Sequence, residues 1–99
     1  MAEMRLAAKI DKNQTEIVAA LRKAGATVQS LAAIGKGCPD LLVGYNGFTV
    51  LMEIKAPDAP FGRAALTKDQ LKWHSEWRGS SLAIVNSVDA ALELLRICK

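Results

Sequence analysis

The chain has 99 residues, of which 51% are hydrophobic and 23% charged, and its formal net charge is +3. This size suits one domain with a single core, and the composition is ordinary for a globular protein. No apolar run approaches the roughly 20 residues of a membrane span, the N-terminal stretch MAEMRLAAKIDKNQ lacks the features of a signal peptide, and two cysteines are too few for a disulfide scaffold. We therefore expect a single domain over residues 1–99 in a reduced cytoplasm, with a charge that permits an anionic partner without identifying one.

The first predicted element is a helix that follows a loosely attached start over residues 1–12. Asn13 followed by Glu16 fits a helix-opening capping box, and the apolar residues up to Ala24 fall on one helical face. Gly25 is a good helix end. Residues 27–31 (TVQSL) then suit a strand, and the glycines and proline of GKGCP predict an irregular loop.

Two further strands are predicted at 39–45 and 48–55. Asn46-Gly47 joins them and is the strongest short hairpin signal, because both turn residues must accept a positive φ. Two prolines and a glycine make residues 56–65 (APDAPFGRAA) a loop.

The C-terminal part is predicted to contain a helix, a buried strand and a final helix. Thr67 and Gln70 form a second capping box that opens a helix to about Arg78. SLAIVN reads as a buried strand, and Ser87 can cap a helix that runs through VDAALELLRIC. The order helix, three strands, helix, strand, helix predicts an α/β fold in which helices flank a mixed sheet.

The hairpin predicts a cluster of charges at its open end. If Asn46-Gly47 is a two-residue turn, Tyr45 pairs with Phe48 and Asp40 faces Glu53. Directly opposite residues have Cβ atoms roughly 5 Å apart on one face. Side chains alternate along a strand, so Lys55 shares the face of Glu53.

Two carboxylates opposite one another repel unless a cation lies between them. Lys55 could supply part of that charge, and a hard divalent ion could supply more, since carboxylates, a backbone carbonyl and waters suit magnesium. Such an ion can activate a water and hold a phosphate oxygen. The alternative is a surface salt bridge between Glu53 and Lys55, with Asp40 merely starting a strand.

These residues match a known pattern. Pro39-Asp40 followed by Glu53-x-Lys55 resembles the PD-(D/E)XK nuclease core, with its restriction-endonuclease-like fold. The wider pattern is similar to the VRR-NUC branch over about residues 13–86, through Glu16, GKGCPDLLVG, LMEIKAP and LTKDQLKWH. The resemblance implies Mg²⁺- or Mn²⁺-dependent hydrolysis of DNA phosphodiesters.

The resemblance also implies roles for six residues. They are metal ligation by Asp40, Glu53 and the Ile54 carbonyl, catalysis by Lys55, and support of the site by Gln70 and Glu16. The sequence leaves Gln70 and Glu16 open, because each also occupies the last position of a capping box.

For other residues the sequence gives less support for a role in the site. Four basic residues could contact the DNA backbone, although each is also consistent with an ordinary surface charge: Lys36, Arg63, Lys68 and Lys72. Trp73 and Trp77 are expected in the core or an interface rather than stacked on bases. Cys38 is expected as a small buried residue, and His74 is not expected to act as the general base.

Stand-alone VRR-NUC proteins of this length are similar to phage-type enzymes, some of which are dimeric Holliday-junction resolvases. We therefore expect a homodimeric endonuclease acting on branched DNA in a bacterial or phage-infected cell. The alternatives are a flap or other structure-specific nuclease, a non-catalytic DNA-binding module, and an assembly protein whose charged hairpin is only a salt bridge.

Overall fold

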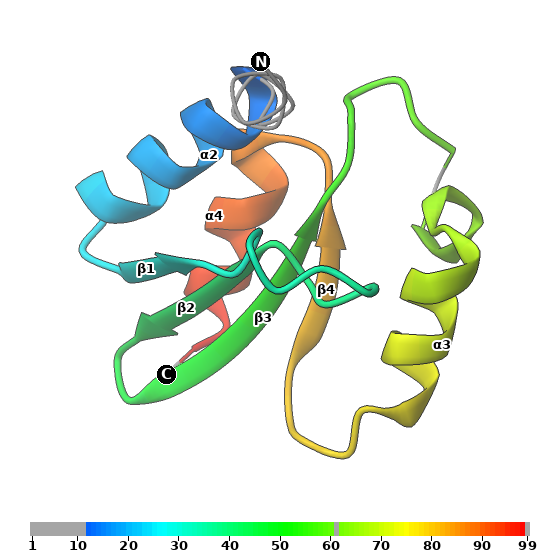
Figure 1. Ribbon diagram of the computed structural model, residues 1–99. Helices are drawn as coiled ribbons and strands as arrows, with labels where there is room; N and C mark the ends of the chain where they lie inside the picture. Colours follow the sequence, from blue (N-terminus) through cyan, green and yellow to red (C-terminus); the bar gives the residue numbers. More distant parts are fainter. Residues whose placement is uncertain (1–11, 61, 99) are drawn as a thin grey trace.

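The computed structural model describes residues 12–60 and 62–98. Its elements are α2 (Lys12–Lys23), β1 (Thr27–Ser30), β2 (Leu41–Tyr45), β3 (Phe48–Ile54), the 3₁₀ helix η1 (Gly62–Ala65), α3 (Lys68–Glu76), β4 (Leu82–Val85) and α4 (Val88–Arg96) (Figure 1). The predicted order of helices and strands is confirmed, and η1 is a short addition within the predicted loop.

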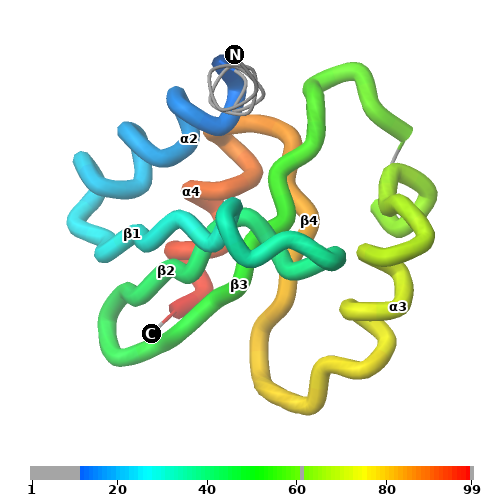
Figure 2. Tube along the Cα trace, viewed as in Figure 1, coloured from blue at the N-terminus to red at the C-terminus, as the bar shows by residue number. Residues whose placement is uncertain are grey.

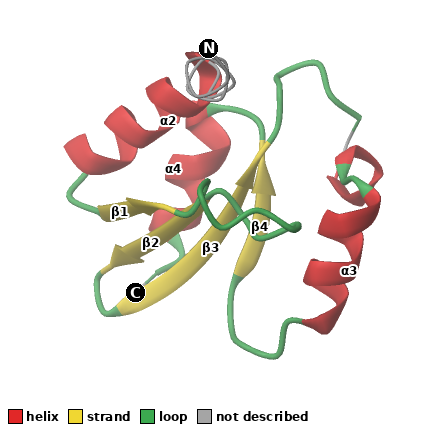
Figure 3. Ribbon diagram, in the orientation of Figure 1, coloured by secondary structure: helices red, strands yellow, loops and turns green. Residues whose placement is uncertain are grey.

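The four strands form one mixed sheet in the order β1-β2-β3-β4 (Figure 3). The β1–β2 and β2–β3 pairs are antiparallel, and β4 pairs parallel with β3. Helices flank this sheet, so the predicted α/β architecture is confirmed. In the described part of the chain, no helix has the length and apolar character needed to cross a membrane.

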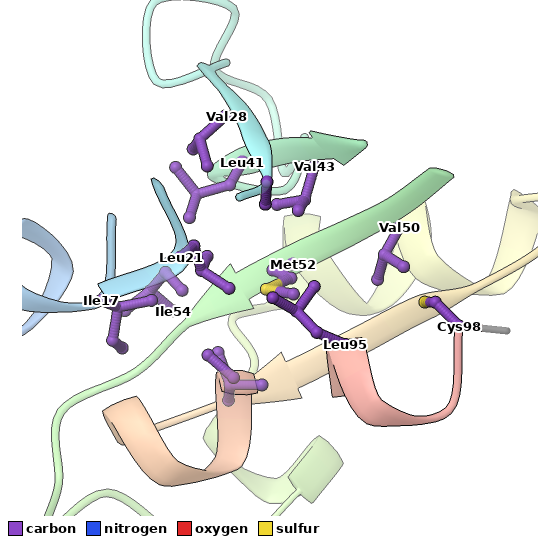
Figure 4. Close-up of a cluster of buried hydrophobic side chains, with 13 residues drawn as sticks. Ile17, Leu21, Val28, Leu41, Val43, Val50, Met52, Ile54, Leu95 and Cys98 are labelled. Carbon is purple, nitrogen blue, oxygen red and sulfur yellow. The ribbon is translucent and has the colours of Figure 1, made fainter. Parts of the chain in front are cut away.

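The core lies between the sheet and the helices α2 and α4, which pack against each other. Alternate residues of β2 and β3 point into it, among them Leu41, Val43 and Met52, which are fully buried (Figure 4). Burial of such side chains is the main favourable term in folding. The opposite face of β3 carries Leu51 and Glu53, both buried although neither belongs to this core cluster.

The β2–β3 hairpin has the predicted register, from Tyr45–Phe48 at the turn to Leu41–Met52. Asn46 and Gly47 have φ values of 53° and 83°, as a two-residue turn of this kind requires.

Several predicted boundaries are wrong by a few residues. The strand predicted at 39–45 begins at Leu41, the strand predicted at 48–55 ends at Ile54, and α3 ends at Glu76 rather than Arg78. The last difference has a local cause, because Trp77 is extended and its N–H bonds to the His74 carbonyl.

Two other predictions are wrong, one about the start of α2 and one about the burial of β4. Lys12 is already helical, so Asn13 lies inside α2 and does not cap it; the rest of the predicted loose start lies outside the described residues. The strand predicted as buried, β4, has only Val85 buried. It is an edge strand, with a neighbour on one side only.

Candidate active site

The candidate site lies at the open end of the hairpin, where β2 begins and β3 ends. Asp40 stands one residue before β2, and its Oδ2 accepts a hydrogen bond of 2.7 Å from the Ile54 backbone N–H. The Asp40 side chain thus continues the pairing with β3 beyond the last backbone pair. On the other side of β3, the Lys55 N–H donates to the Val85 carbonyl at 2.9 Å.

Glu53 is the centre of the site and is only 2% exposed. Its Oε2 accepts a hydrogen bond of 2.9 Å from Gln70 Nε2 and lies 3.7 Å from Lys55 Nζ. Its other oxygen, Oε1, is buried without a hydrogen-bond donor in the part of the chain that the structure describes. Buried polar atoms nearly always have a partner, so this oxygen is the atom of the cluster that can still bind a proton, a donor group or a cation.

Gln70 joins this site to the first turn of α3. Its Oε1 accepts from Lys55 Nζ at 2.7 Å and from the Thr67 N–H at 2.9 Å, while its own N–H bonds to Thr67 Oγ1 at 3.2 Å. The sequence left a capping role and a site role open. Both hold, because one amide serves the helix end and the charged pair together.

The protonation of Glu53 depends on its burial and on Asp40. Burial, the negative charge of Asp40 and hydrogen bonding with Asp40 raise the pKa of Glu53 to about 8, against the opposing effect of Lys55. With a pKa of about 8, Glu53 holds a proton at neutral pH, which lowers its repulsion with Asp40. Burial and the same two carboxylates also raise the pKa of Cys38, which is half-buried rather than buried as predicted.

The loop before Asp40 reaches from the end of β1 toward α3 (Figure 2). Gly35, Lys36 and Gly37 all have positive φ, at 70°, 55° and 86°, a conformation that costs a residue with a side chain 1–2 kcal/mol. Gly37 lies so close to the α3 backbone that a Cβ would collide with the Asp69 carbonyl. This contact holds the loop against the helix that carries Gln70.

Glu16 is not joined to this cluster by any hydrogen bond or ion pair in the described part of the chain. Its side chain is 53% exposed and pairs with Lys12 at 3.9 Å. A neighbour in α2 makes the connection instead, because Asn13 Nδ2 donates to the Lys55 carbonyl at 2.7 Å and to the Asn86 carbonyl at 3.1 Å. The sequence offered no signal for this role, since a capping residue was the only reading of Asn13.

The four candidate DNA-contact residues are all exposed and lie on three segments: Lys36 in the loop before Asp40, Arg63 in η1, and Lys68 and Lys72 in α3. Lys36 and Lys72 line one surface hollow together with Trp73. Arg63 lines a different pocket that includes Lys55.

The aromatic residues of α3 form a stack on the surface. The rings of Trp73 and Trp77 are 5.2 Å apart and nearly parallel, and Trp77 is 38% exposed. His74 is half-buried, and burial, Arg63 and Lys55 lower its pKa. Its Nε2 has no hydrogen-bond partner in the described ranges.

The described residues contain no group of three or more His, Cys, Asp or Glu able to hold a metal ion. A metal at this site would therefore depend on the two carboxylates and on backbone oxygens. No family model matches the sequence, and neither the curated proteins nor the solved structures gave a match.

Proposed function

We propose that the protein is a Mg²⁺-dependent endonuclease that hydrolyses DNA phosphodiesters, with a PD-(D/E)XK core of the VRR-NUC type. The observation that carries the proposal is Glu53 Oε1, which is buried beside a second carboxylate and close to a lysine and has no hydrogen-bond partner among residues 12–60 and 62–98. A purely structural salt bridge would leave no reason to bury this oxygen without a donor.

The residues present fit a hard divalent cation. Asp40, Glu53 and the Ile54 carbonyl would hold it, because oxygen donors with two negative charges suit Mg²⁺ and Mn²⁺. Bound there, the ion would supply Lewis acidity and a more acidic water. Its positive charge would also replace the proton that Glu53 holds at neutral pH.

Lys55 is the residue that we assign to the reaction itself. Its ammonium group is held by Gln70 Oε1 and lies beside Glu53, so its position is set before substrate arrives. There it can orient the attacking water and offset negative charge that develops on the phosphate. Water is the nucleophile, so no covalent enzyme–DNA intermediate forms.

The test is nicking of supercoiled plasmid DNA with Mg²⁺ or with EDTA. Lys55→Ala should lower the rate by at least about 100-fold, because an acid–base or electrostatic group usually contributes a factor of this size to the rate. The matched control is Lys23→Ala, which removes an exposed lysine at the far end of α2 and should leave the rate unchanged. Equal activity of wild type and Lys55→Ala would mean that a contaminating nuclease cuts the DNA.

Metal binding is tested separately by titration calorimetry with Mn²⁺. Wild type should bind and Asp40→Asn should bind much more weakly, because the substitution removes one of two charged ligands. Absence of binding to wild type would leave the charged hairpin as a structural salt bridge.

We further propose branched DNA as the substrate, because some of the VRR-NUC proteins that the sequence resembles are Holliday-junction resolvases. Matched four-way, flap and linear DNAs of the same arm sequence provide the comparison. Faster cutting of the four-way junction is expected, and equal cutting of all three would contradict junction resolution while leaving the nuclease intact.

A further inference from the structure

A pocket with a largely apolar lining and a few polar side chains adjoins the candidate active site through Lys55. It has a volume of about 380 Å³ and lies between η1, the end of β4 and α4. Its polar lining consists of Lys55, Arg63 and Asn86, with Ile84 and Val85 among the apolar residues. The volume is near the lower end of the range for small-ligand sites.

All the charged residues that line this pocket carry a positive charge. Its lining includes two cations and no acidic residue, and Arg63 has no ion pair within residues 12–60 and 62–98. Both cations also act on one neighbour, since Arg63 and Lys55 lower the pKa of His74 after the larger effect of burial. Arg63 lines the pocket from η1, and Lys55 lines it from the residue that follows β3.

The walls of the pocket are fixed by contacts outside it. The Asn86 carbonyl accepts from Asn13 Nδ2, and the Asn86 side chain donates to the Pro57 carbonyl at 3.4 Å. On the other wall, the N–H of buried Leu66 donates to the Arg63 carbonyl at 3.1 Å and anchors η1. An exposed arginine on a fixed turn can meet a ligand without rearranging the backbone.

We infer that this pocket binds a phosphate group of the substrate other than the one that is cleaved, with Arg63 as its principal ligand. The planar guanidinium can bond a phosphate through two N–H groups at once. The inference rests on the proposed function, because Lys55 borders both sites and would place the second phosphate next to the bond that is cut. The phosphate can belong to an internal phosphodiester or to a 5′-terminal phosphomonoester.

The experiment measures binding in EDTA, where no cleavage occurs, by fluorescence anisotropy over a range of salt concentrations. The probe is one short single-stranded DNA, made with a 5′-phosphate or a 5′-hydroxyl and labelled at its 3′ end. Arg63→Ala is compared with Arg78→Ala, whose side chain bonds only the Ser75 carbonyl of its own turn among the described residues. Circular dichroism checks that both exposed variants are folded.

Loss of one phosphate contact should reduce the slope of log affinity against log salt by about 0.7 in Arg63→Ala. Arg78→Ala should keep the wild-type slope. Arg63→Lys should recover part of the affinity, because lysine keeps the positive charge but lacks the paired N–H groups of the guanidinium. Equal slopes in Arg63→Ala and wild type, or equal losses in the two alanine variants, would overturn the inference.

The two probes separate the sources of the phosphate. A preference for the 5′-phosphate that disappears in Arg63→Ala assigns the pocket to a terminal phosphate, and loss of slope without such a preference assigns it to an internal one. Failure here is distinguishable from failure of the proposed function. Mg²⁺-dependent nicking can persist without the Arg63 effect, and the Arg63 effect can persist in a protein that does not nick DNA.

Discussion

At the scale of single residues, the chemistry of this protein centres on one buried acid. Glu53 is almost fully buried, and its neighbours compensate its charge only in part. Burying a carboxylate without full compensation is costly, so the group holds a proton instead. A raised pKa in a cluster with a specific lysine is also typical of functional sites.

The first prediction concerns the stability of the metal-free protein. The pKa of Glu53 is raised from an ordinary value of 4.5 to about 8 in the folded state. Between these values the folded state binds more protons than the unfolded state, so the free energy of unfolding falls as pH rises. Glu53→Gln removes this titrating group. The free energy of unfolding of the variant, relative to that of wild type, should therefore rise by roughly 1 kcal/mol per pH unit in that window.

Urea denaturation of both proteins in EDTA at pH 5, 6, 7 and 8 provides the measurement. Glu93→Gln is the control, because Glu93 is 61% exposed and pairs only with Arg96 in the described chain. A difference between Glu53→Gln and wild type that is constant with pH would contradict a raised pKa for Glu53.

At the scale of elements, the first turn of α3 serves two purposes. Its capping box is predicted from Thr67 and Gln70 and is present in full. The same amide also bridges Lys55 and Glu53. The start of the helix and the arrangement of the charged pair are therefore coupled through one side chain.

Two substitutions distinguish the capping of α3 from the contact between Gln70 and Lys55. Thr67→Ala removes the cap and should cost about 1 kcal/mol of stability while leaving the nicking rate within a few-fold of wild type. Gln70→Ala should cost a similar amount and also lower the rate by at least about tenfold, since Lys55 loses its positioning partner. Equal rates in the two variants would show that Gln70 acts only as a cap.

The glycine loop before Asp40 gives a second prediction at this scale. Gly35→Ala and Gly37→Ala both place a side chain at positive φ, which costs about 1 kcal/mol. Only at Gly37 would the new methyl collide with the α3 backbone, whereas Gly35 has open space around it. Gly37→Ala should therefore be the less stable protein and should bind Mn²⁺ more weakly, because the displaced loop carries Asp40.

Urea denaturation and Mn²⁺ calorimetry of the pair check this expectation. Equal losses of stability and unchanged Mn²⁺ affinity in both variants would mean that packing of the loop on α3 does not position Asp40.

At the scale of the whole molecule, the proposed action on branched DNA needs two active sites. One 10.6 kDa chain carries one candidate site, so we expect a homodimer. Trp77, which is 38% exposed at the C-terminal end of α3 and stacked on Trp73, is an aromatic group available for such an interface. Buried aromatic residues often dominate the energy of interfaces.

Sedimentation velocity of wild type at micromolar concentration should give twice the chain mass, and Trp77→Glu should give the monomer. Circular dichroism shows whether the variant is folded. A monomeric wild type that still cuts four-way junctions would contradict the dimer.

Much of the fold was predictable because its signals are local. Asn46-Gly47 requires positive φ at both residues, and this set the hairpin register that the structure confirms. The cap at Thr67 likewise depends on residues three positions apart. The burial of β4, by contrast, depends on neighbours distant in the sequence.

The candidate site was predictable only where it follows from the hairpin. Register and alternation brought Asp40, Glu53 and Lys55 to one end of a strand pair, because they follow from backbone geometry. The connection from Asn13 to the Lys55 carbonyl could not be foreseen, since it joins residues 42 positions apart. The exposure of Glu16 likewise depends on how α2 packs.

By itself, the sequence determined the order of elements, the hairpin register and the meeting of two acids with a lysine, because short-range hydrogen bonding and strand alternation specify them. The tertiary structure decided that Glu53 is buried with one oxygen unpartnered, that Gln70 bridges it to Lys55, and that Arg63 faces the same pocket as Lys55. These features arise when segments far apart in the chain pack together and exclude water. Burial then sets the protonation of Glu53, which no local pattern encodes.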